Sequence, residues 1–300
     1  MLDQRSPEGL EEKFAGVLRR RFPEGTRGRT ALRSARRIWR RSGAVARGAI
    51  AVLGRPYLGP PAPEPLGPVL DVFGKSYPRA FFIQVGSNDA DMLDPLRRQI
   101  LGRQWSGIMI EPVPDIFERL QRKYSGKPGL VFENVAIADR DGTTELYYLP
   151  HSADAELPPW YDALASLRKD VILKHEKFIH DIEQRVATMQ VPCLTFNSLC
   201  VKHGVSSADL IQIDTEGYDY EIIKQIDLSR LRPKLLMFEH LHMDTATRQA
   251  CVSYLHAQGY EFLSNGMDTL CLLTNGLTDR DRALRRRWRQ MRARKWPKDW

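Results

Sequence analysis

The chain has 300 residues, of which 42% are hydrophobic and 27% are charged, and its net charge is +8. This size suits one large α/β domain with appended segments, and no run approaches the roughly 20 apolar residues that span a bilayer. The four cysteines form no Cys-x-x-Cys pair and no ligand-like spacing with histidine. We therefore expect free buried thiols, no structural zinc and, without a signal peptide at the start, a cytoplasmic protein.

The positive charge is concentrated at the two ends of the chain. Residues 1–55 hold 14 Lys and Arg against 5 Asp and Glu, residues 279–300 hold 10 against 3, and the residues between them carry a net charge of −8. An acidic centre argues against a nucleic-acid groove in the core, so we expect no nucleic-acid partner there. The basic arm and tail are predicted either to bind an anionic membrane surface, which would make the protein peripheral, or to stay solvated.

A Pro- and Gly-rich linker with a short lead-in helix, residues 56–77, separates the arm from a folded domain predicted over 78–278. Apolar runs of strand length then alternate with helical patterns. The predicted strands are 80–85, 105–110, 130–136, 143–149, 191–195, 210–213, 233–238, 260–263 and 269–273. This alternation predicts βαβ units and a parallel sheet, closed by the last two strands as an antiparallel pair.

Residues 150–190 interrupt the alternation. They contain a mixed helical stretch at 162–184 and are too long for an ordinary connection. We predict an insertion or lid on the substrate side of the domain. The strand at 143–149 is expected to form a hairpin with the strand at 130–136.

Three predicted strands end in residues suited to ligand binding. Gly86 allows close backbone approach, Glu111 is placed to hydrogen-bond a ribose diol, and Asp214 begins the acidic turn Asp-Thr-Glu-Gly. The first turn, Gly86 to Asp91, lacks the Gly-x-Gly-x-x-Gly pattern that docks a pyrophosphate and carries Asp89 and Asp91 instead. This favours the cationic, phosphate-free S-adenosylmethionine over NAD.

Four motifs, in this order, resemble the FkbM-type methyltransferases, a branch of the class I S-adenosylmethionine-dependent enzymes. They are Gly86-Ser-Asn-Asp89, Ile110-Glu-Pro112, Glu133-Asn-Val-Ala-Ile137 with Asp141-Gly142, and Ile213-Asp-Thr-Glu-Gly217. The resemblance covers about residues 78–275 without the insertion. It implies a Rossmann-like, doubly wound, three-layer αβα fold of about seven strands with one final antiparallel strand. It also implies methylation of an oxygen, such as a hydroxyl of a sugar, glycolipid or natural product.

The same resemblance implies roles for individual residues. The methionine part of the cofactor would be lined by Gly86, Ser87 and Asn88, with Asp89 beside them; the ribose would be held by Glu111, with Pro112 beside it; the adenine would be flanked by Asn134, Val135 and Ala136. Asp214 would face the methionine end and the acceptor. Two residues depart from the family pattern: Ala90 stands where many members have Gly, which is tolerable if its φ is negative, and Gln212 stands where many have Lys.

A hydroxyl acceptor requires a general base because its pKa is high. The predicted catalytic residues are Asp214, Glu239 and His240, with His240 ranked first because histidine titrates near neutral pH. Further candidates are Glu216, His242 and, through lid closure, His175 and His180. Asp214, Glu216 and Glu239 are also a candidate Mg²⁺ site, although no metal is part of the expected mechanism. The alternative function is a non-catalytic nucleotide-binding or scaffold protein whose basic ends bind acidic partners.

Overall fold

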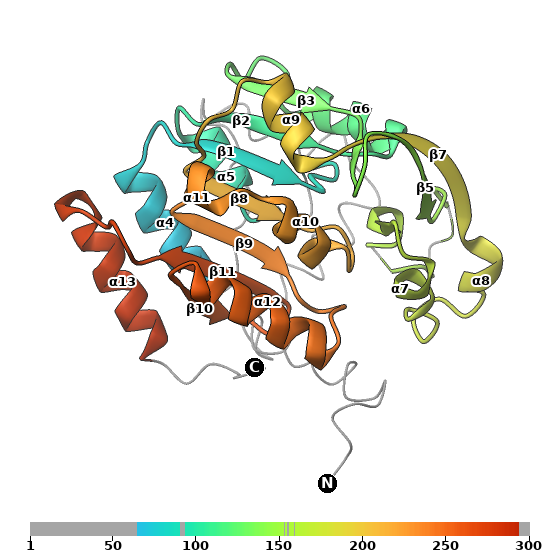
Figure 1. Cartoon of the computed structure of the whole chain (residues 1–300). Coiled ribbons are helices and arrows are strands. Elements are labelled where there is room, and N and C mark those ends of the chain that lie inside the picture. The colour runs from blue at the N-terminus through green and yellow to red at the C-terminus, as the bar shows by residue number, and fades with distance from the viewer. Residues whose placement is uncertain (1–64, 91–93, 153, 155, 159, 294–300) are drawn as a thin grey trace, which may run out of the picture. The chain divides into compact units, whose positions relative to one another are not determined.

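The computed structural model describes residues 65–90, 94–152, 154, 156–158 and 160–293, and it is built around a seven-stranded sheet (Figure 1). The strand order is β10-β11-β9-β8-β1-β2-β3, and β11 runs antiparallel to the other six strands. The strands are β1 (Phe81–Val85), β2 (Ser106–Ile110), β3 (Leu130–Glu133), β8 (Leu210–Ile213), β9 (Leu235–Glu239), β10 (Tyr260–Ser264) and β11 (Asp268–Leu273). The predicted Rossmann-like sheet with a final antiparallel strand is confirmed. The predicted arm 1–55, the linker up to residue 64 and Asp91 lie outside the described residues.

Helices cover both faces of the sheet because successive residues of its buried strands point to opposite sides. Ile83 and Val85 of β1 pack into one hydrophobic core and Phe82 into another. The first core is covered by α9 (Phe196–Lys202), α10 (Asp219–Gln225), α11 (Leu228–Leu231) and α12 (Thr245–Ala257). The second is covered by α4 (Leu66–Ser76), α5 (Arg97–Gly102), α6 (Pro114–Lys123) and α13 (Arg282–Arg292). The result is the expected three-layer αβα arrangement.

The strand order reverses between β1 and β8. The chain runs outward through β1, β2 and β3 and then returns to β8 on the other side of β1. Ligands bind outside the carboxyl ends of strands at such a switch point. Here the backbones are very close: a Cβ on Gly86 would lie 1.8 Å from the Asp214 carbonyl oxygen, and Gly86 has a φ of +75°. Only glycine fits this position.

The predicted strand at 130–136 is wrong in its last part. The main-sheet strand ends at Glu133, and β4 (Ala136–Ile137) pairs instead with β7 (Ala187–Leu194) in a second, four-stranded sheet of order β4-β7-β5-β6. The chain turns at Asn134, whose side-chain amide donates to the carbonyl oxygens of Glu111 and Pro112. The expected hairpin is also wrong, because β5 (Gly142–Tyr148) pairs with β7 and with β6 (Ala165–Ser166) rather than with β3.

The insertion contains short elements in place of one long helical stretch. It holds the 3₁₀ turn η1 (Tyr161–Ala163), α7 (Lys169–Leu173) and α8 (Ile182–Arg185), and its last residues belong to β7. These elements pack around a small hydrophobic core of their own that includes Leu164, Ile172 and Ile179.

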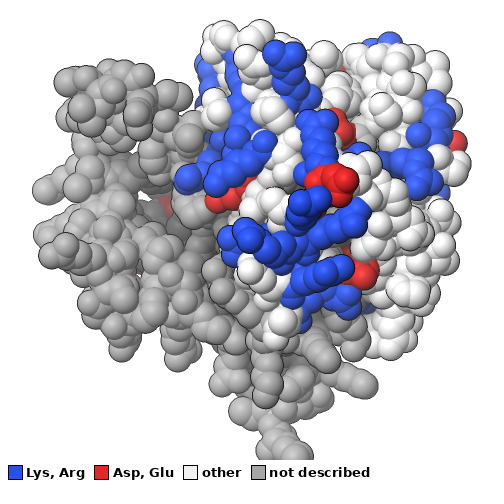
Figure 2. All heavy atoms as spheres, turned by 90° about the vertical axis from the view of Figure 1, so that its left-hand side faces the viewer, with Lys and Arg blue, Asp and Glu red and all other residues white. Residues whose placement is uncertain are grey.

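The basic tail is part of the folded unit as far as it is described. After η2 (Asp279–Asp281), α13 buries Leu284, Trp288 and Met291 in the core that α4 helps to form. The Trp288 indole also donates to Glu261 (2.7 Å). The expectation of a solvated end is therefore wrong for 282–292, because three apolar residues at helical spacing provide a packing face, whereas contact of this region with a membrane stays a prediction. Lys and Arg side chains gather on the outer face of this region (Figure 2). Trp296 and Trp300 lie outside the described residues.

Candidate functional site

The turn after β1 is fastened to the end of β2. The backbone N–H groups of Gly86 and Ser87 donate to the Ile110 carbonyl (3.0 and 2.9 Å). The buried Ser87 hydroxyl donates to the Gln84 carbonyl and accepts from the Ile110 N–H (3.2 Å each). Asn88 follows with a left-handed φ of 48°. The first turn is thus held rigidly at the switch point.

Glu111 lies at the centre of this edge and is 4% exposed. One carboxylate oxygen accepts from the Asn88 N–H (3.0 Å) and the other from the Val113 N–H (2.9 Å). Burial raises the pKa of Glu111 to about 7, although these two hydrogen bonds act to lower it. A carboxylate accepts about four hydrogen bonds, so Glu111 retains the capacity to accept a ribose diol.

The other predicted cofactor residues surround Glu111 in different ways. Asn134 braces the strand end through the two hydrogen bonds described above, and Val135 and Ala136 after it are buried. Asp89 instead forms ion pairs with two cations of α6, Lys123 (3.0 Å) and Arg119 (3.8 Å). The contact of Asp89 with the cofactor stays a prediction, and the two ion pairs do not favour it because they already occupy the carboxylate.

The two departures from the family pattern have structural consequences. The φ of Ala90 is +57°, so the condition under which alanine would be tolerable, a negative φ, is not met, and a left-handed alanine costs roughly 1–2 kcal/mol. Gln212 is 2% exposed and lies in register with Gln84, whose amide donates to Asp94 (2.9 Å). A lysine at position 212 would bring a cation to the face of the sheet that holds this hydrogen-bonded pair.

The acidic turn after β8 is organised by Asp219, which the sequence did not single out. This side chain is 0% exposed and accepts from the Thr215 N–H (3.3 Å), the Thr215 hydroxyl (3.0 Å) and the Glu239 N–H (3.1 Å). It therefore ties the turn to the end of β9. Its position in the first turn of a helix, just after a glycine, is the only signal that the sequence offers.

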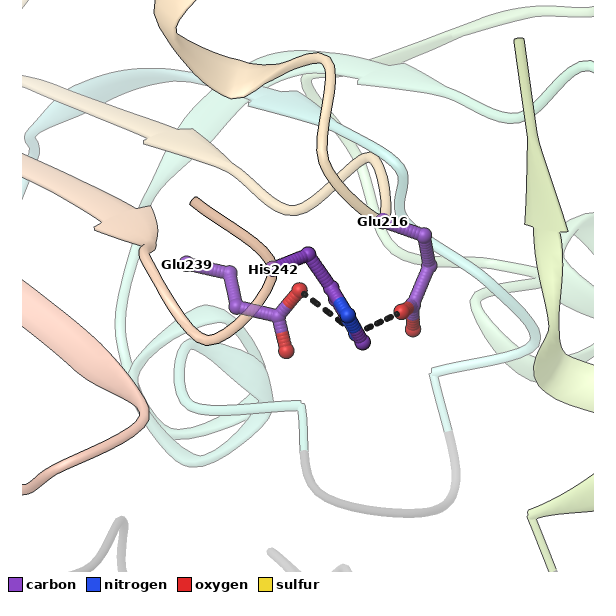
Figure 3. Close-up of side chains that lie close together, drawn as sticks. All are labelled: Glu216, Glu239 and His242. Carbon is purple, nitrogen blue, oxygen red and sulfur yellow. Dashed lines mark ion pairs between the residues drawn. The ribbon is translucent and has the colours of Figure 1, made fainter. Parts of the chain in front are cut away.

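Two carboxylates and one histidine converge at the ends of β8 and β9 (Figure 3). His242 Nε2 lies 2.9 Å from Glu216 Oε2 and 3.7 Å from Glu239 Oε2. The exposed fraction of the side chain is 7% for His242, 20% for Glu216 and 9% for Glu239. Burial and the neighbouring Glu216 raise the pKa of Glu239 well above its usual range. Burial also acts to raise the pKa of Glu216, but the hydrogen bond and charge of His242 lower it overall. We call these residues the Glu-Glu-His cluster.

The structure brings together only some of the predicted catalytic residues. His240 is 1% exposed and lies 2.9 Å from the Thr269 hydroxyl, outside the Glu-Glu-His cluster, so its role as base stays a prediction without geometric support. His242, three residues after the end of β9, is the histidine that faces Glu216. Asp214 lies at the end of β8, where burial and Glu216 raise its pKa well above the usual range. Of the carboxylates considered for Mg²⁺, Glu216 and Glu239 converge, and the third donor beside them is His242.

The insertion packs onto this edge. The Asn88 amide donates to the Ala163 carbonyl (3.3 Å), and the Ser166 hydroxyl donates to the Glu216 carbonyl (2.7 Å). The ring of His175 lies 5.2 Å from that of His242 between centroids, and burial lowers its pKa. His180, the other candidate of the insertion, is exposed.

The family model described as "Methyltransferase FkbM domain" matches residues 84–262, which is more than half of the chain and includes the whole site. The chain belongs to the FkbM methyltransferase family. This confirms the resemblance drawn from the motifs, and together with the fold it identifies the domain as a methyltransferase.

Several solved structures are similar to this chain at low sequence identity. The methyltransferase FkbM from Methylobacillus flagellatus KT is 12% identical with a TM-score of 0.42, and the match covers 65% of this chain but only 44% of that one. The METTL16 methyltransferase domain is 10% identical (TM-score 0.37; 70% and 66% covered). A precorrin-6y C5,15-methyltransferase from Geobacter metallireducens GS-15 is 12% identical (TM-score 0.32; 67% and 77% covered). No protein with a curated description matches the sequence.

Proposed function

We propose that this protein transfers the methyl group of S-adenosylmethionine to a hydroxyl of a sugar, glycolipid or natural product. The observation that carries the proposal is the Glu-Glu-His cluster, which lies at the same carboxyl edge of the sheet as Gly86 and Glu111. One half of this edge suits a nucleoside, and the other half offers acceptors for a proton.

The residues at the first two strand ends fit the cofactor. Glu111 would accept from the ribose diol, Gly86 to Asn88 would line the methionine part, and Asn134 to Ala136 would flank the adenine. The carboxylates at the ends of β8 and β9 create the negative potential that a sulfonium and an ammonium group require. When bound, this cofactor supplies a methyl group that a nucleophile can displace from sulfur in line.

The electrostatics favour a hydroxyl acceptor over an amine. Nearby carboxylates raise the pKa of a bound amine and keep it protonated, and a protonated amine is not nucleophilic. A hydroxyl instead needs a group that takes its proton. The Glu216–His242 pair, joined at 2.9 Å, is the arrangement in which a carboxylate orients and supports a histidine base.

The insertion supplies aromatic surface beside the Glu-Glu-His cluster. Trp160 lies 5.2 Å from His175 and 5.8 Å from Phe178 between ring centroids, and Phe178 is 38% exposed. Flat aromatic faces next to polar groups suit the apolar face of a sugar ring. This supports a glycan or glycosylated acceptor.

Calorimetry of the full chain with S-adenosylmethionine tests the cofactor assignment. We expect binding by the wild type and loss of binding in Glu111→Ala; no binding by the wild type would favour the non-catalytic alternative. A methyl-labelled cofactor offered with nucleotide sugars and with their amino-sugar counterparts then tests the acceptor. Label in base-stable ethers would support the proposal, whereas label on the amines alone would contradict it.

We also propose that the outer face of α13 holds the protein at an anionic membrane surface. Four of its arginines, Arg282, Arg285, Arg286 and Arg289, line one hollow of the surface. The apolar side of α13 is buried against the domain, so the contact would be electrostatic rather than inserted. No helix among the described residues is long and apolar enough to cross a membrane.

A further inference from the structure

The Glu-Glu-His cluster has the geometry of a metal-binding site. One donor atom from each of Glu216, Glu239 and His242 lies within 4.8 Å of the others. Metal–ligand bonds of about 2.0–2.2 Å place neighbouring ligand atoms about 3–4 Å apart. The separations of 2.9 and 3.7 Å from His242 Nε2 to the two carboxylates agree with this range.

Glu239 provides an independent observation. Glu239 is 8% exposed, and its Oε2 atom is buried without a hydrogen-bond partner. This oxygen lies 3.7 Å from His242 Nε2 (Figure 3). A buried carboxylate oxygen without a partner is costly, and a cation between the three side chains would satisfy it. The Glu239 carboxylate thus points to a position where a bound cation would satisfy it.

A second Glu–His pair in the same chain shows what a completed arrangement looks like. Glu133 lies 2.6 Å from His203 Nε2, and the Lys202 ammonium lies 2.8 Å from the same carboxylate. That pair has its own cation. Within the described part of the chain, no lysine or arginine forms an ion pair with Glu216 or Glu239.

The backbones that carry the ligands are fixed. The Asp219 carboxylate accepts hydrogen bonds from the Glu239 N–H (3.1 Å) and from the hydroxyl of Thr215, the residue before Glu216. The Ser166 hydroxyl donates to the Glu216 carbonyl (2.7 Å). Such outer contacts orient metal ligands before the ion binds. One imidazole with two carboxylates suits a transition-metal ion such as Mn²⁺ better than Mg²⁺, which prefers oxygen ligands alone.

We propose that Glu216, Glu239 and His242 bind one divalent transition-metal ion of the Mn²⁺ class. The ion would lie at the carboxyl edge and hold the acceptor's oxygen there. The placement of the acceptor's oxygen rests on the proposed function, whereas the binding of the metal ion does not. A bound ion would lower the pKa of the acceptor's hydroxyl, whose proton would then pass to solvent rather than to His242.

Mn²⁺ binding is measured on the full chain after treatment with EDTA, by electron paramagnetic resonance of free Mn²⁺ and by calorimetry. Manganese is the probe because the four buried cysteines would attract softer metals. We expect one ion per wild-type chain and, for Glu239→Gln and His242→Gln, an affinity at least about 10-fold to 100-fold weaker. His203→Gln is the matched control and should bind as the wild type does.

Thermal unfolding of each variant confirms that it folds; two variants are used so that one misfolded protein does not decide the result. The absence of Mn²⁺ binding by the wild type, or equal binding by both variants and the wild type, would overturn the proposal. Failure of the proposed function looks different: the chain would then bind Mn²⁺ but not S-adenosylmethionine. A chain that binds S-adenosylmethionine but no Mn²⁺ overturns the metal site and leaves the histidine base.

Discussion

The raised pKa of Glu111 allows a direct test of whether this edge of the sheet binds a ribose. Burial raises that pKa to about 7, and only the ionised carboxylate can accept hydrogen bonds from both hydroxyls of a diol. A group with this pKa is about nine-tenths ionised at pH 8 and about one-tenth ionised at pH 6. If only the ionised form binds, affinity for a nucleoside falls about tenfold between pH 8 and pH 6.

Adenosine is the appropriate probe because it contains the ribose diol but no amino-acid part that titrates in this range. Calorimetry at pH 6, 7 and 8 should show the tenfold change for the wild type and weak, pH-independent binding for Glu111→Gln. Glu133→Gln is the matched control: Glu133 is 8% exposed and ends the neighbouring strand, but it pairs with Lys202 and His203. Equal wild-type affinity at pH 6 and pH 8, or an unchanged pH dependence in Glu111→Gln, would refute the reasoning.

The same shift makes a linked prediction about stability. Because the folded-state pKa of Glu111 is raised above its usual 4.5, the folded protein binds this proton more tightly than the unfolded chain. The contribution of Glu111 to stability therefore falls as the pH rises from about 4.5 to about 7, by about 3 kcal/mol in total. Denaturant titrations should show that the free energy of unfolding of the wild type, relative to Glu111→Gln, decreases over this window and is constant above it.

Three further changes test the parts around the site. Trp288→Ala should lower the free energy of unfolding by about 3–5 kcal/mol in urea titrations, because the 2%-exposed ring packs between α13 and the domain; a loss below about 1 kcal/mol would mean that α13 is not docked. Arg232→Gly should raise the free energy of unfolding by about 1 kcal/mol, because Arg232 caps the end of α11 with a left-handed φ of 42°, which glycine adopts without strain. Arg286→Glu combined with Arg289→Glu should reduce sedimentation with anionic vesicles, whereas the exposed Arg122→Glu on α6 should not; equal sedimentation of all three proteins would remove the membrane proposal.

The strand ends could be predicted because local pattern and topology agree there. Apolar runs that stop at Gly86, Glu111 and Asp214 belong to parallel strands, and the carboxyl ends of parallel strands share one edge. The histidine after β9 could not be chosen in the same way. His240 and His242 are both close to the strand end, but His240 turns back against Thr269 of β11, and that antiparallel neighbour is fixed only by the tertiary fold.

Two predictions from the sequence are wrong for different reasons. The arginine-rich composition of the tail predicts a solvated segment, although Leu284, Trp288 and Met291 have the helical spacing of a buried stripe. The apolar run through Asn134 predicts one strand because nothing local marks the change of sheet. The break depends on hydrogen bonds from Asn134 to residues more than 20 positions earlier, which no short window of sequence contains.

The two Glu–His pairs show why residue types alone do not define a site. Both pairs join a carboxylate at or just after a strand end to an imidazole, with separations of 2.6 and 2.9 Å. The third partner differs: Lys202 neutralises the pair at Glu133, whereas Glu239 adds a second negative charge to the pair at Glu216. A neutralised pair has little left to bind, while an excess of buried negative charge must be relieved by a proton or a cation. Measuring Mn²⁺ and protons bound by the wild type and Glu239→Gln separates these outcomes, because a metal site loses its ion in the variant, whereas a purely proton-binding site holds no Mn²⁺ in either protein.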